Sequence, residues 1–476
     1  MKKIGKLKIN PSAEQSLGSH VSIGFECLDR EMFDPERCYD ILGQSGVKYA
    51  RVQTGWVKCE TEKGVYNFDW LDDIANNLLK RGIQPWFNVG FGNPLYMSNI
   101  STPSAVGCCP MCYEDDVFAA WKNFVAALVR HYADRVTYYE IWNEPDIPNF
   151  WFPGKANPAE YAELVNLTGE VIVGNAENAK IGACMSEAFP SACNHSKEYF
   201  SIFARKVKHL DFFSYHRYAT RADVDLEQNV RFIRKIFAMN GLENLELWGG
   251  ECGYPSWMPV EHSIHPVGNS SEHQQAVNLL RYYVTDAAVG CRMTSFYTIA
   301  DYLQKTYHTA LGDFKDFPLY GILNGITYAP KEGYHALANI SNLFGHDFKV
   351  SDRFMALYTR YTRPYVNMAV QPFYASFERN GKPFYVYYYP TYIEDECGLF
   401  EKPLCVRLQN IDADDFMTDP VAVDSLTGDV YEPERREDFM DLTVLHGMPV
   451  AEYPIFIMER SELEIGPVFS DSGKTV

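Results

Sequence analysis

Up to about residue 342 the chain alternates short apolar runs with longer segments that carry apolar residues at helical spacing. Apolar runs rich in β-branched and aromatic residues favour strands, and the longer segments favour amphipathic helices. We predict strands at residues 20–25, 47–52, 83–89, 138–144, 179–185, 211–216, 245–251 and 291–298. We predict helices at residues 34–45, 70–80, 116–132, 158–176, 230–239 and 271–289. Strands that alternate with helices in this way indicate a parallel sheet with helical cover.

The number of these alternations predicts that the sheet closes into a (β/α)8 barrel, the TIM-barrel fold. An open, doubly wound sheet is the alternative. The first predicted strand is not followed by the G-x-G-x-x-G pattern that often accompanies that fold. We therefore assign residues 16–344 to a (β/α)8 barrel in the α/β class.

A different pattern begins at about residue 342, where short predicted strands follow one another without helices. They lie at residues 369–377, 383–389, 404–408, 421–424 and 450–458. Turn signals such as Asn380-Gly381 and Thr427-Gly428 separate them. This spacing predicts a β-sandwich, which we place at residues 345–476. Residues 1–15 form an N-terminal segment, and its pairing with the sandwich is a further hypothesis.

Two of the predicted barrel strands end in a glutamate. Residues 138–146 read YYEIWNEPD, and Pro145 should stop the strand at about Glu144 because proline cannot donate to a sheet ladder. Residues 245–251 read LELWGGE and end in Glu251. In a (β/α)8 barrel, catalytic side chains gather at the carboxyl ends of the strands.

A pair of glutamates in these places points to glycoside cleavage. That reaction uses one carboxyl group to protonate the leaving oxygen and a second one as nucleophile or base. Either glutamate alone is more often a surface charge, a cap or an ion pair. The two together, each at the end of an apolar strand, favour the chemical interpretation.

Composition and charge narrow the classes of function. A content of 46% hydrophobic and 22% charged residues is typical of a globular protein, and a formal net charge of −19 argues against nucleic acid as a partner. No apolar run approaches the roughly 20 residues that a membrane span needs. Residues 1–11 lack the continuous apolar segment of a secretory signal, and twelve cysteines fit a reducing compartment, so we expect a cytoplasmic location. The sequence leaves open whether the protein is a monomer or a homo-oligomer.

One cysteine cluster could suggest a metal. Cys108, Cys109 and Cys112 lie close together, but structural zinc needs four ligands, usually from two such groups, and the chain has no second C-x-x-C. We therefore expect free thiols, no metal and no cofactor. The role of the three cysteines stays open.

Aromatic residues make up 15% of the chain, and flat aromatic faces suit sugar rings. The tryptophans considered for stacking are Trp56, Trp86, Trp151 and Trp257. For any one of them, packing in the core or in a loop is the commoner role.

The stretch around Glu144 resembles a known family. Residues 141–151 read IWNEPDIPNFW, and a second glutamate follows the seventh predicted strand. This arrangement resembles clan A of the glycoside hydrolases and is most similar to glycoside hydrolase family 39, the β-xylosidase and α-L-iduronidase family. The resemblance implies a (β/α)8 barrel with an appended β-sandwich. It also implies a retaining mechanism in which Glu144 is the acid/base and Glu251 is the nucleophile.

The same resemblance implies roles for four neighbouring residues. Asn143 would hold the sugar 2-hydroxyl, and Arg51 would keep the nucleophile ionised. His216 and Tyr218 match a His-x-Tyr pair that contacts the nucleophile and the sugar. Without the resemblance, Arg51 could be an ordinary structural ion pair and His216 a buried core imidazole.

The chain departs from the family pattern on the walls that would face the sugar. Residues 250–257 read GECGYPSW, and the eighth predicted strand offers Phe296 and Tyr297 where many clan members place a tryptophan. These departures concern the substrate rather than the reaction. We expect Tyr297, Trp257 and Trp56 to contact the sugar and Cys252 to be a neutral wall residue.

The sequence as a whole predicts an exo-acting, β-xylosidase-like retaining glycoside hydrolase with an oligosaccharide or glycoside substrate. A transglycosidase or an endo-glycanase could use the same site. A non-catalytic sugar-binding barrel is the alternative outside the enzymes, and the two glutamates with Asn143 disfavour it. No motif gives the sugar or its anomeric configuration.

Overall fold

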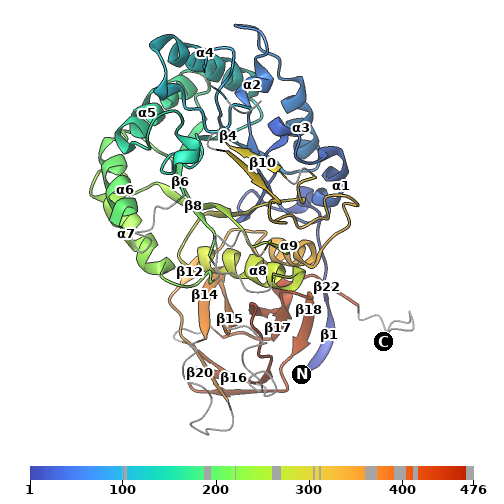
Figure 1. Cartoon of the computed structure of the whole chain (residues 1–476). Helices are drawn as coiled ribbons and strands as arrows, with labels where there is room; N and C mark the ends of the chain where they lie inside the picture. Colours follow the sequence, from blue (N-terminus) through green and yellow to red (C-terminus); the bar gives the residue numbers. More distant parts are fainter. Residues whose placement is uncertain are drawn as a thin grey trace.

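The computed structural model places a closed barrel above a region of antiparallel sheets (Figure 1). It describes residues 1–98, 100, 104–186, 194–219, 221–259, 270–303, 306–309, 312–359, 372–390, 404–410 and 416–467. Residues 369–371 of one predicted strand therefore lie outside the described residues.

Parallel strands form the barrel, and their order around the ring follows the chain. They are β2 (Val21–Gly24), β3 (Tyr49–Gln53), β4 (Gln84–Val89), β5 (Tyr138–Ile141), β6 (Lys180–Met185), β7 (Phe212–Arg217), β8 (Glu246–Cys252) and β9 (Met293–Phe296). The last strand, β9, pairs in parallel with β2, with Ser295 opposite Ser22, so the ring closes. The predicted (β/α)8 fold is confirmed.

An aromatic layer fills the barrel interior. The rings of Trp248 and Phe212 stack with centroids 3.9 Å apart, and Trp86 meets Trp248 edge-on at 5.3 Å. The guanidinium carbon of Arg51 lies 5.5 Å from the centroid of Trp86. Strands covered on both faces read as continuous apolar runs, which is why most of these strands were visible in the sequence.

Helices cover the outside of the ring. They are α1 (Tyr39–Gly43), α2 (Trp56–Cys59), α3 (Asp69–Lys80), α4 (Asp115–Tyr132), α5 (Pro158–Asn175), α6 (Asn194–Lys206), α7 (Leu226–Ala238), α8 (Glu272–Ala288) and α9 (Glu332–Leu343). The sequence pattern had missed α2, α6 and α9, and the helix predicted at residues 34–45 is much shorter than predicted. The Asp34 side chain accepts from Glu36 N and tightens the start into a 3-10 turn, Pro35–Arg37, so that only the short α1 remains. None of the helices in the described part of the chain is long and apolar enough to cross a bilayer.

The strand that carries the first glutamate is shorter than predicted. Strand β5 ends at Ile141 and not at about Glu144. Trp142 and Glu144 adopt φ values of 69° and 44°, and this left-handed backbone cannot continue a strand. Pro145 is therefore not what stops it.

Antiparallel strands form two further sheets below the barrel. One has the order β12-β14-β15-β21-β17-β18-β1-β22, and the other has the order β13-β16-β20-β19. Apolar side chains from both sheets, including Tyr385, Ile457, Val406 and Leu445, share one core cluster. This arrangement fits the predicted C-terminal β-sandwich.

The strands of these two sheets and of one hairpin complete the fold. They are β1 (Lys2–Leu7), β10 (Thr306–Thr309), β11 (Gly312–Lys315), β12 (Lys349–Ser351), β13 (Met355–Thr359), β14 (Phe373–Arg379), β15 (Lys382–Tyr388), β16 (Leu404–Gln409), β17 (Pro420–Asp424), β18 (Asp429–Glu432), β19 (Arg435–Phe439), β20 (Leu442–Met448), β21 (Ile455–Glu459) and β22 (Ile465–Gly466). Strands β10 and β11 pair with each other. Strand β1 pairs with β18 and with β22, so the N-terminus lies against the C-terminal strands (Figure 1). We propose that residues 16–344 are the barrel domain and residues 345–476 the sandwich domain, with residues 1–15 as an N-terminal segment that pairs with the second.

Helix α8 joins the barrel to the sandwich. Its Arg281 is buried and donates from Nε to Glu452 O at 2.8 Å. At its start, His273 contacts Glu332 Oε1 through Nδ1 at 2.9 Å and Glu452 Oε1 through Nε2 at 3.0 Å. An imidazole that donates from both nitrogens carries a positive charge. The hydrogen bond to Glu452 is the largest of the effects that raise the pKa of His273 to about 9.

This contact should make the stability of the protein depend on pH. Because the pKa of His273 is raised from 6.5 to about 9 on folding, its stabilising contribution is complete below pH 6.5 and is lost as pH rises through 9. Replacing His273 with Gln should therefore lower the Tm more at pH 6 than at pH 9.5. His335→Gln, at an exposed position of α9, is the matched control. A Tm difference between wild type and His273→Gln that is constant with pH would contradict the assignment.

Candidate active site

The guanidinium of Arg51 lies at the centre of the site and is completely buried. All of its N–H groups have acceptors. Nε and Nη2 donate to Glu140 Oε2 at 3.0 and 2.5 Å. Nη2 also donates to Asn143 Oδ1 at 2.9 Å. Nη1 donates to Glu26 Oε2 at 2.9 Å and to Glu251 Oε2 at 2.6 Å. Burial opposes the charge of Arg51, but the carboxylates outweigh it and raise the pKa well above its ordinary value.

A bulge in β8 turns Glu251 toward this cation. The pairing of β8 with β7 skips Gly250, and a bulge changes the direction of the side chain that follows it. A Cβ atom on Gly250 would lie 1.7 Å from Ser214 Oγ, so only glycine fits. Glu251 thereby accepts a hydrogen bond from Arg51 at Oε2, and the Tyr218 hydroxyl donates to Oε1 at 2.5 Å.

The left-handed turn after β5 places Glu144 on the opposite side of the same space. Its Oε1 lies 2.8 Å from His216 Nδ1, and its backbone N–H donates to Cys184 Sγ at 3.4 Å. Burial, assisted by Arg51 and opposed by Glu251, lowers the pKa of His216. A neutral imidazole can accept a hydrogen bond from a protonated Glu144 or donate one to its carboxylate.

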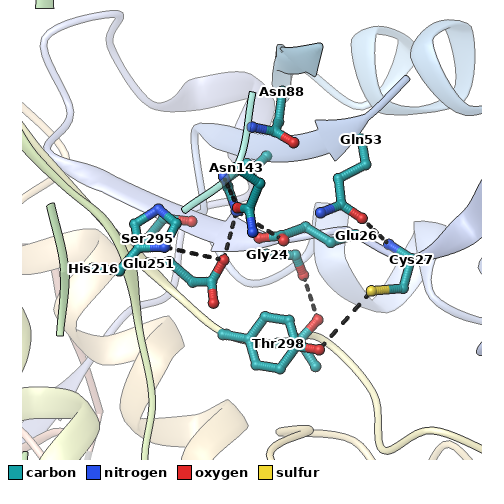
Figure 2. Close-up of polar contacts among 12 residues, drawn as sticks. Gly24, Glu26, Cys27, Gln53, Asn88, Asn143, His216, Glu251, Ser295 and Thr298 are labelled. Atoms are coloured by element: carbon teal, nitrogen blue, oxygen red, sulfur yellow. Dashed lines mark hydrogen bonds and ion pairs between the residues drawn. The ribbon is translucent and has the colours of Figure 1, made fainter. Parts of the chain in front are cut away.

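The two glutamates lie close together. A carboxylate oxygen of Glu144, one of Glu251 and a ring nitrogen of His216 all lie within 4.8 Å of one another. The side chains of the two glutamates are 12% and 11% exposed, so both reach solvent only at their tips. Figure 2 shows Glu26, Asn143, His216 and Glu251 turned toward one another at the carboxyl ends of the strands.

The same three donors, Glu144, His216 and Glu251, are close enough to share a metal ion. Arg51 Nη1 already lies 2.6 Å from Glu251 Oε2, and its positive charge would repel a second cation at that oxygen. The hydrogen bond between Glu144 Oε1 and His216 Nδ1 also occupies atoms that would have to bind the metal. The arrangement suits proton transfer better than metal binding.

Two carboxylates of the site, Glu26 and Glu140, were not among the residues predicted from sequence. Glu140 lies inside β5, and its Oε2 also accepts from Asn88 Nδ2 at 2.8 Å. A single acidic residue within an apolar strand was an available signal, because a buried charge requires a buried partner. Glu26 lies two residues after the end of β2, but no motif around it pointed to the site.

Two of the predicted sugar contacts, Asn143 and Tyr297, lie in this region, and a third, Trp257, lies further along the chain. Asn143 is 4% exposed, and Arg51 fixes its side-chain oxygen, which leaves the amide N–H groups as donors. The ring of Tyr297 meets Tyr218 edge-on at 6.4 Å. Trp257 follows β8 and is 47% exposed. Contact of these residues with a sugar stays a prediction.

The prediction that Trp56 stacks on a sugar is wrong. Trp56 lies in α2 with no exposed surface, and its ring stacks on Tyr96 at 5.4 Å and on Phe124 at 5.6 Å. Its Nε1 donates to Glu60 Oε2 at 2.6 Å. Trp86 and Trp151 are enclosed in the same way. Packing against neighbouring aromatic side chains leaves none of the three a face for a ligand.

The cysteines in the described residues are free thiols. Cys108 and Cys109 are buried and Cys112 is partly buried, and a hydrogen bond to Cys109 lowers the pKa of the Cys112 thiol. Cys252, next to Glu251, donates from Sγ to Ser295 O at 3.5 Å. Burial raises the pKa of Cys252, so this thiol is neutral, as expected for a wall residue.

Comparison with solved structures supports the fold. A family 39 glycoside hydrolase from Bacteroides cellulosilyticus WH2 gives a TM-score of 0.65 at 16% identity, over 95% of this chain and 82% of that one. A GH39 β-xylosidase from Caulobacter crescentus gives a TM-score of 0.53 at 15% identity, over 94% and 97% of the two chains. At these identities the likeness concerns the fold alone.

Comparison of sequences supports the family. The family model described as Glycosyl hydrolases family 39 matches residues 39–240. A β-xylosidase from Geobacillus stearothermophilus is 26% identical over 176 residues, which are 34% of this chain and 32% of that protein. A β-xylosidase from Caldicellulosiruptor saccharolyticus is 22% identical over 348 residues, 66% of this chain and 65% of that protein. The chain thus spans about a third and just under two thirds of the length of these curated relatives. The family model over residues 39–240, these relatives and a fold shared by solved family 39 structures together support glycoside hydrolase family 39, in clan A, as the family that this chain resembles.

Proposed function

We propose that this protein is a retaining glycoside hydrolase that cleaves oligosaccharides by double displacement. The observation that carries the proposal is the separation of the two glutamates, whose carboxylate oxygens lie within 4.8 Å at the ends of β5 and β8. Retaining enzymes hold their carboxyl groups about 5–5.5 Å apart, whereas inverting enzymes leave about 6.5–9.5 Å for a water molecule. The short separation supports the retaining mechanism.

In the first step, the carboxylate of Glu251 attacks the anomeric carbon and the bond to the leaving oxygen breaks. Glu144 gives its proton to that oxygen. Arg51 and Tyr218 each hold one oxygen of Glu251, which orients the nucleophile and favours its ionised form. Asn143 is the proposed hydrogen-bond donor to the sugar 2-hydroxyl.

In the second step, Glu144 takes a proton from water while that water attacks the anomeric carbon and displaces Glu251. Glu144 thus needs to change its protonation state twice in each cycle. The neutral imidazole of His216, 2.8 Å away, can pair with either state. This contact supports the assignment of Glu144 as the acid/base.

The proposed substrate class is that of an exo-acting β-xylosidase. The two curated relatives are named as β-xylosidases, and this name is the support for the xyloside preference. A cytoplasmic location is also part of the proposal. Its support is the ten free thiols of the described residues, which fit a reducing compartment.

Replacing Glu251 with Gln should abolish turnover of aryl glycosides. We expect a loss of at least about 10³-fold in kcat, because the amide of glutamine is not a nucleophile that can form the covalent intermediate. The measurement is hydrolysis of a panel that includes aryl β-xyloside, β-glucoside, β-galactoside and α-L-arabinofuranoside. Glu246→Gln, at the exposed start of the same strand, is the matched control. Full activity of the Glu251 variant would refute the proposal.

Replacing Glu144 with Ala should affect substrates according to their leaving group. Alkyl or unactivated aryl glycosides should lose about 10²–10⁴-fold in kcat/KM, because their leaving oxygen needs the proton, whereas a dinitrophenyl glycoside should lose much less. Added azide should restore turnover of the dinitrophenyl substrate and give a glycosyl azide. The anomeric configuration of that azide, read by NMR, should be that of the substrate. An azide of opposite configuration would instead indicate an inverting site.

A further inference from the structure

Glu26 shares a cation with the proposed nucleophile. Its side chain is 1% exposed and lies at the end of β2. Arg51 Nη1 donates to Glu26 Oε2 at 2.9 Å and to Glu251 Oε2 at 2.6 Å. Each carboxylate therefore accepts one N–H of the same nitrogen. A change in the charge of Glu26 then changes how strongly Arg51 stabilises the charge of Glu251.

The second oxygen of Glu26 has no hydrogen-bond partner among the described residues. It lies 3.1 Å from the position that a Cβ atom on Gly24 would take, so it packs against the bare backbone of that glycine (Figure 2). An ionised oxygen in such a place has lost its water without gaining a donor, which is costly. A proton on this oxygen lowers that cost, because a neutral carboxyl group is cheaper to bury than a charged one.

The neighbouring carboxylates are better supported. Glu140 also has one oxygen, Oε1, without a hydrogen-bond partner among the described residues, but its Oε2 accepts from two N–H groups of Arg51 and one of Asn88. Glu251 accepts one hydrogen bond from Arg51 and one from the hydroxyl of Tyr218. Glu26 accepts a single N–H, from the same Arg51 nitrogen that also donates to Glu251. Of the three carboxylates around this single cation, Glu26 is the one that loses least by becoming neutral.

The next cation along the chain, Arg30, contacts the neighbouring Cys27 and pairs with Asp29 at 3.1 Å, so Asp29 balances its charge. Burial raises the pKa of Cys27 and of Tyr302, so both are neutral near pH 7. Burial raises the pKa of Glu26 itself to about 8, and the charges of Glu251 and Glu140 add to the effect of burial while Arg51 opposes it.

We propose that Glu26 is a positioning residue that stays protonated at neutral pH. Because a neutral Glu26 does not compensate the positive charge of Arg51, that charge stabilises the ionised form of Glu251. The inference deepens the proposed function, because it rests on Glu251 being the nucleophile. A neutral Glu26 still accepts from Arg51 Nη1 and holds the guanidinium in place. An ionised Glu26 would compete with Glu251 for that nitrogen and add a like charge beside it.

Infrared spectroscopy of the wild type and the Glu26→Gln variant tests the proton directly. The wild-type protein should show the carbonyl stretch of a protonated carboxyl group at pH 6.5, and the variant should lack that one band. In the wild type the band should disappear as pH rises through about 8. The measurement needs no turnover, so it can fail or succeed independently of the proposed activity. Identical carboxyl bands in the two proteins at pH 6.5 would overturn the proposal.

If the variant does not fold, wild-type protein labelled with ¹³C at the glutamate carboxyl carbons provides the same test by NMR. A carboxyl resonance that titrates between pH 7 and 9 is expected. Its absence would overturn the proposal.

Thermal unfolding gives a second readout. The pKa of Glu26 is raised from 4.5 to about 8 on folding, so its contribution to stability is complete below pH 4.5 and is lost as pH rises through 8. The Tm of the wild type relative to Glu26→Gln should therefore fall from pH 4.5 to pH 8.5. Glu36→Gln, at an exposed position, is the control and should not show this change. A constant Tm difference for Glu26→Gln would count against a protonated Glu26.

Turnover distinguishes positioning from mere packing. Glu26→Leu keeps the bulk of the side chain but removes the acceptor for Arg51, so it should lose much of kcat while KM changes little. Glu26→Gln restores a neutral acceptor and should recover most of that loss. Equal losses in the two variants would show that the carboxyl group does not act as a neutral acceptor.

Discussion

The structure depends on one buried cation. A guanidinium without exposed surface is stable only when its charge is balanced and each N–H has an acceptor. Arg51 meets this requirement with Glu26, Glu140, Asn143 and Glu251, which lie just after β2, within β5, in the turn after β5 and near the end of β8. The contacts that neutralise the cation therefore also connect strands on different sides of the barrel. The fold and the candidate active site share one set of interactions.

Two local departures from regular strand geometry orient the side chains of Glu144 and Glu251 toward each other. After β5, left-handed backbone at Trp142 and Glu144 turns the chain away from the sheet. In β8, a bulge at Gly250 rotates Glu251 toward Arg51. Regular strands would have continued past the barrel mouth without bringing these carboxylates together. Such irregularities are concentrated at functional sites because neighbouring contacts compensate for their cost.

The same type of residue has different roles at different depths in the barrel. Four glutamates lie within one network, yet Glu26 and Glu140 are enclosed while Glu144 and Glu251 reach solvent at their tips. Enclosed carboxylates can set the electrostatics of the site, and only those that reach the cavity can touch a substrate. The tryptophans divide in the same way, since Trp56 is enclosed and Trp257 is half exposed. Depth is a property of the folded chain, so residue type alone could not assign these roles.

The sequence by itself determined the barrel, the β-strands that follow it and the two glutamates at strand ends. It could do so because apolar periodicity and strand length are local properties, and because a carboxylate after an apolar run is visible in one dimension. It did not determine that Glu140 and Glu26 share Arg51 with Glu251, because those contacts join residues between 25 and 200 positions apart. It also placed the end of β5 three residues too late, since a left-handed turn at a tryptophan has no sequence signal. Only the closed ring decided these features, because it fixes which distant side chains must balance a charge that has no access to water.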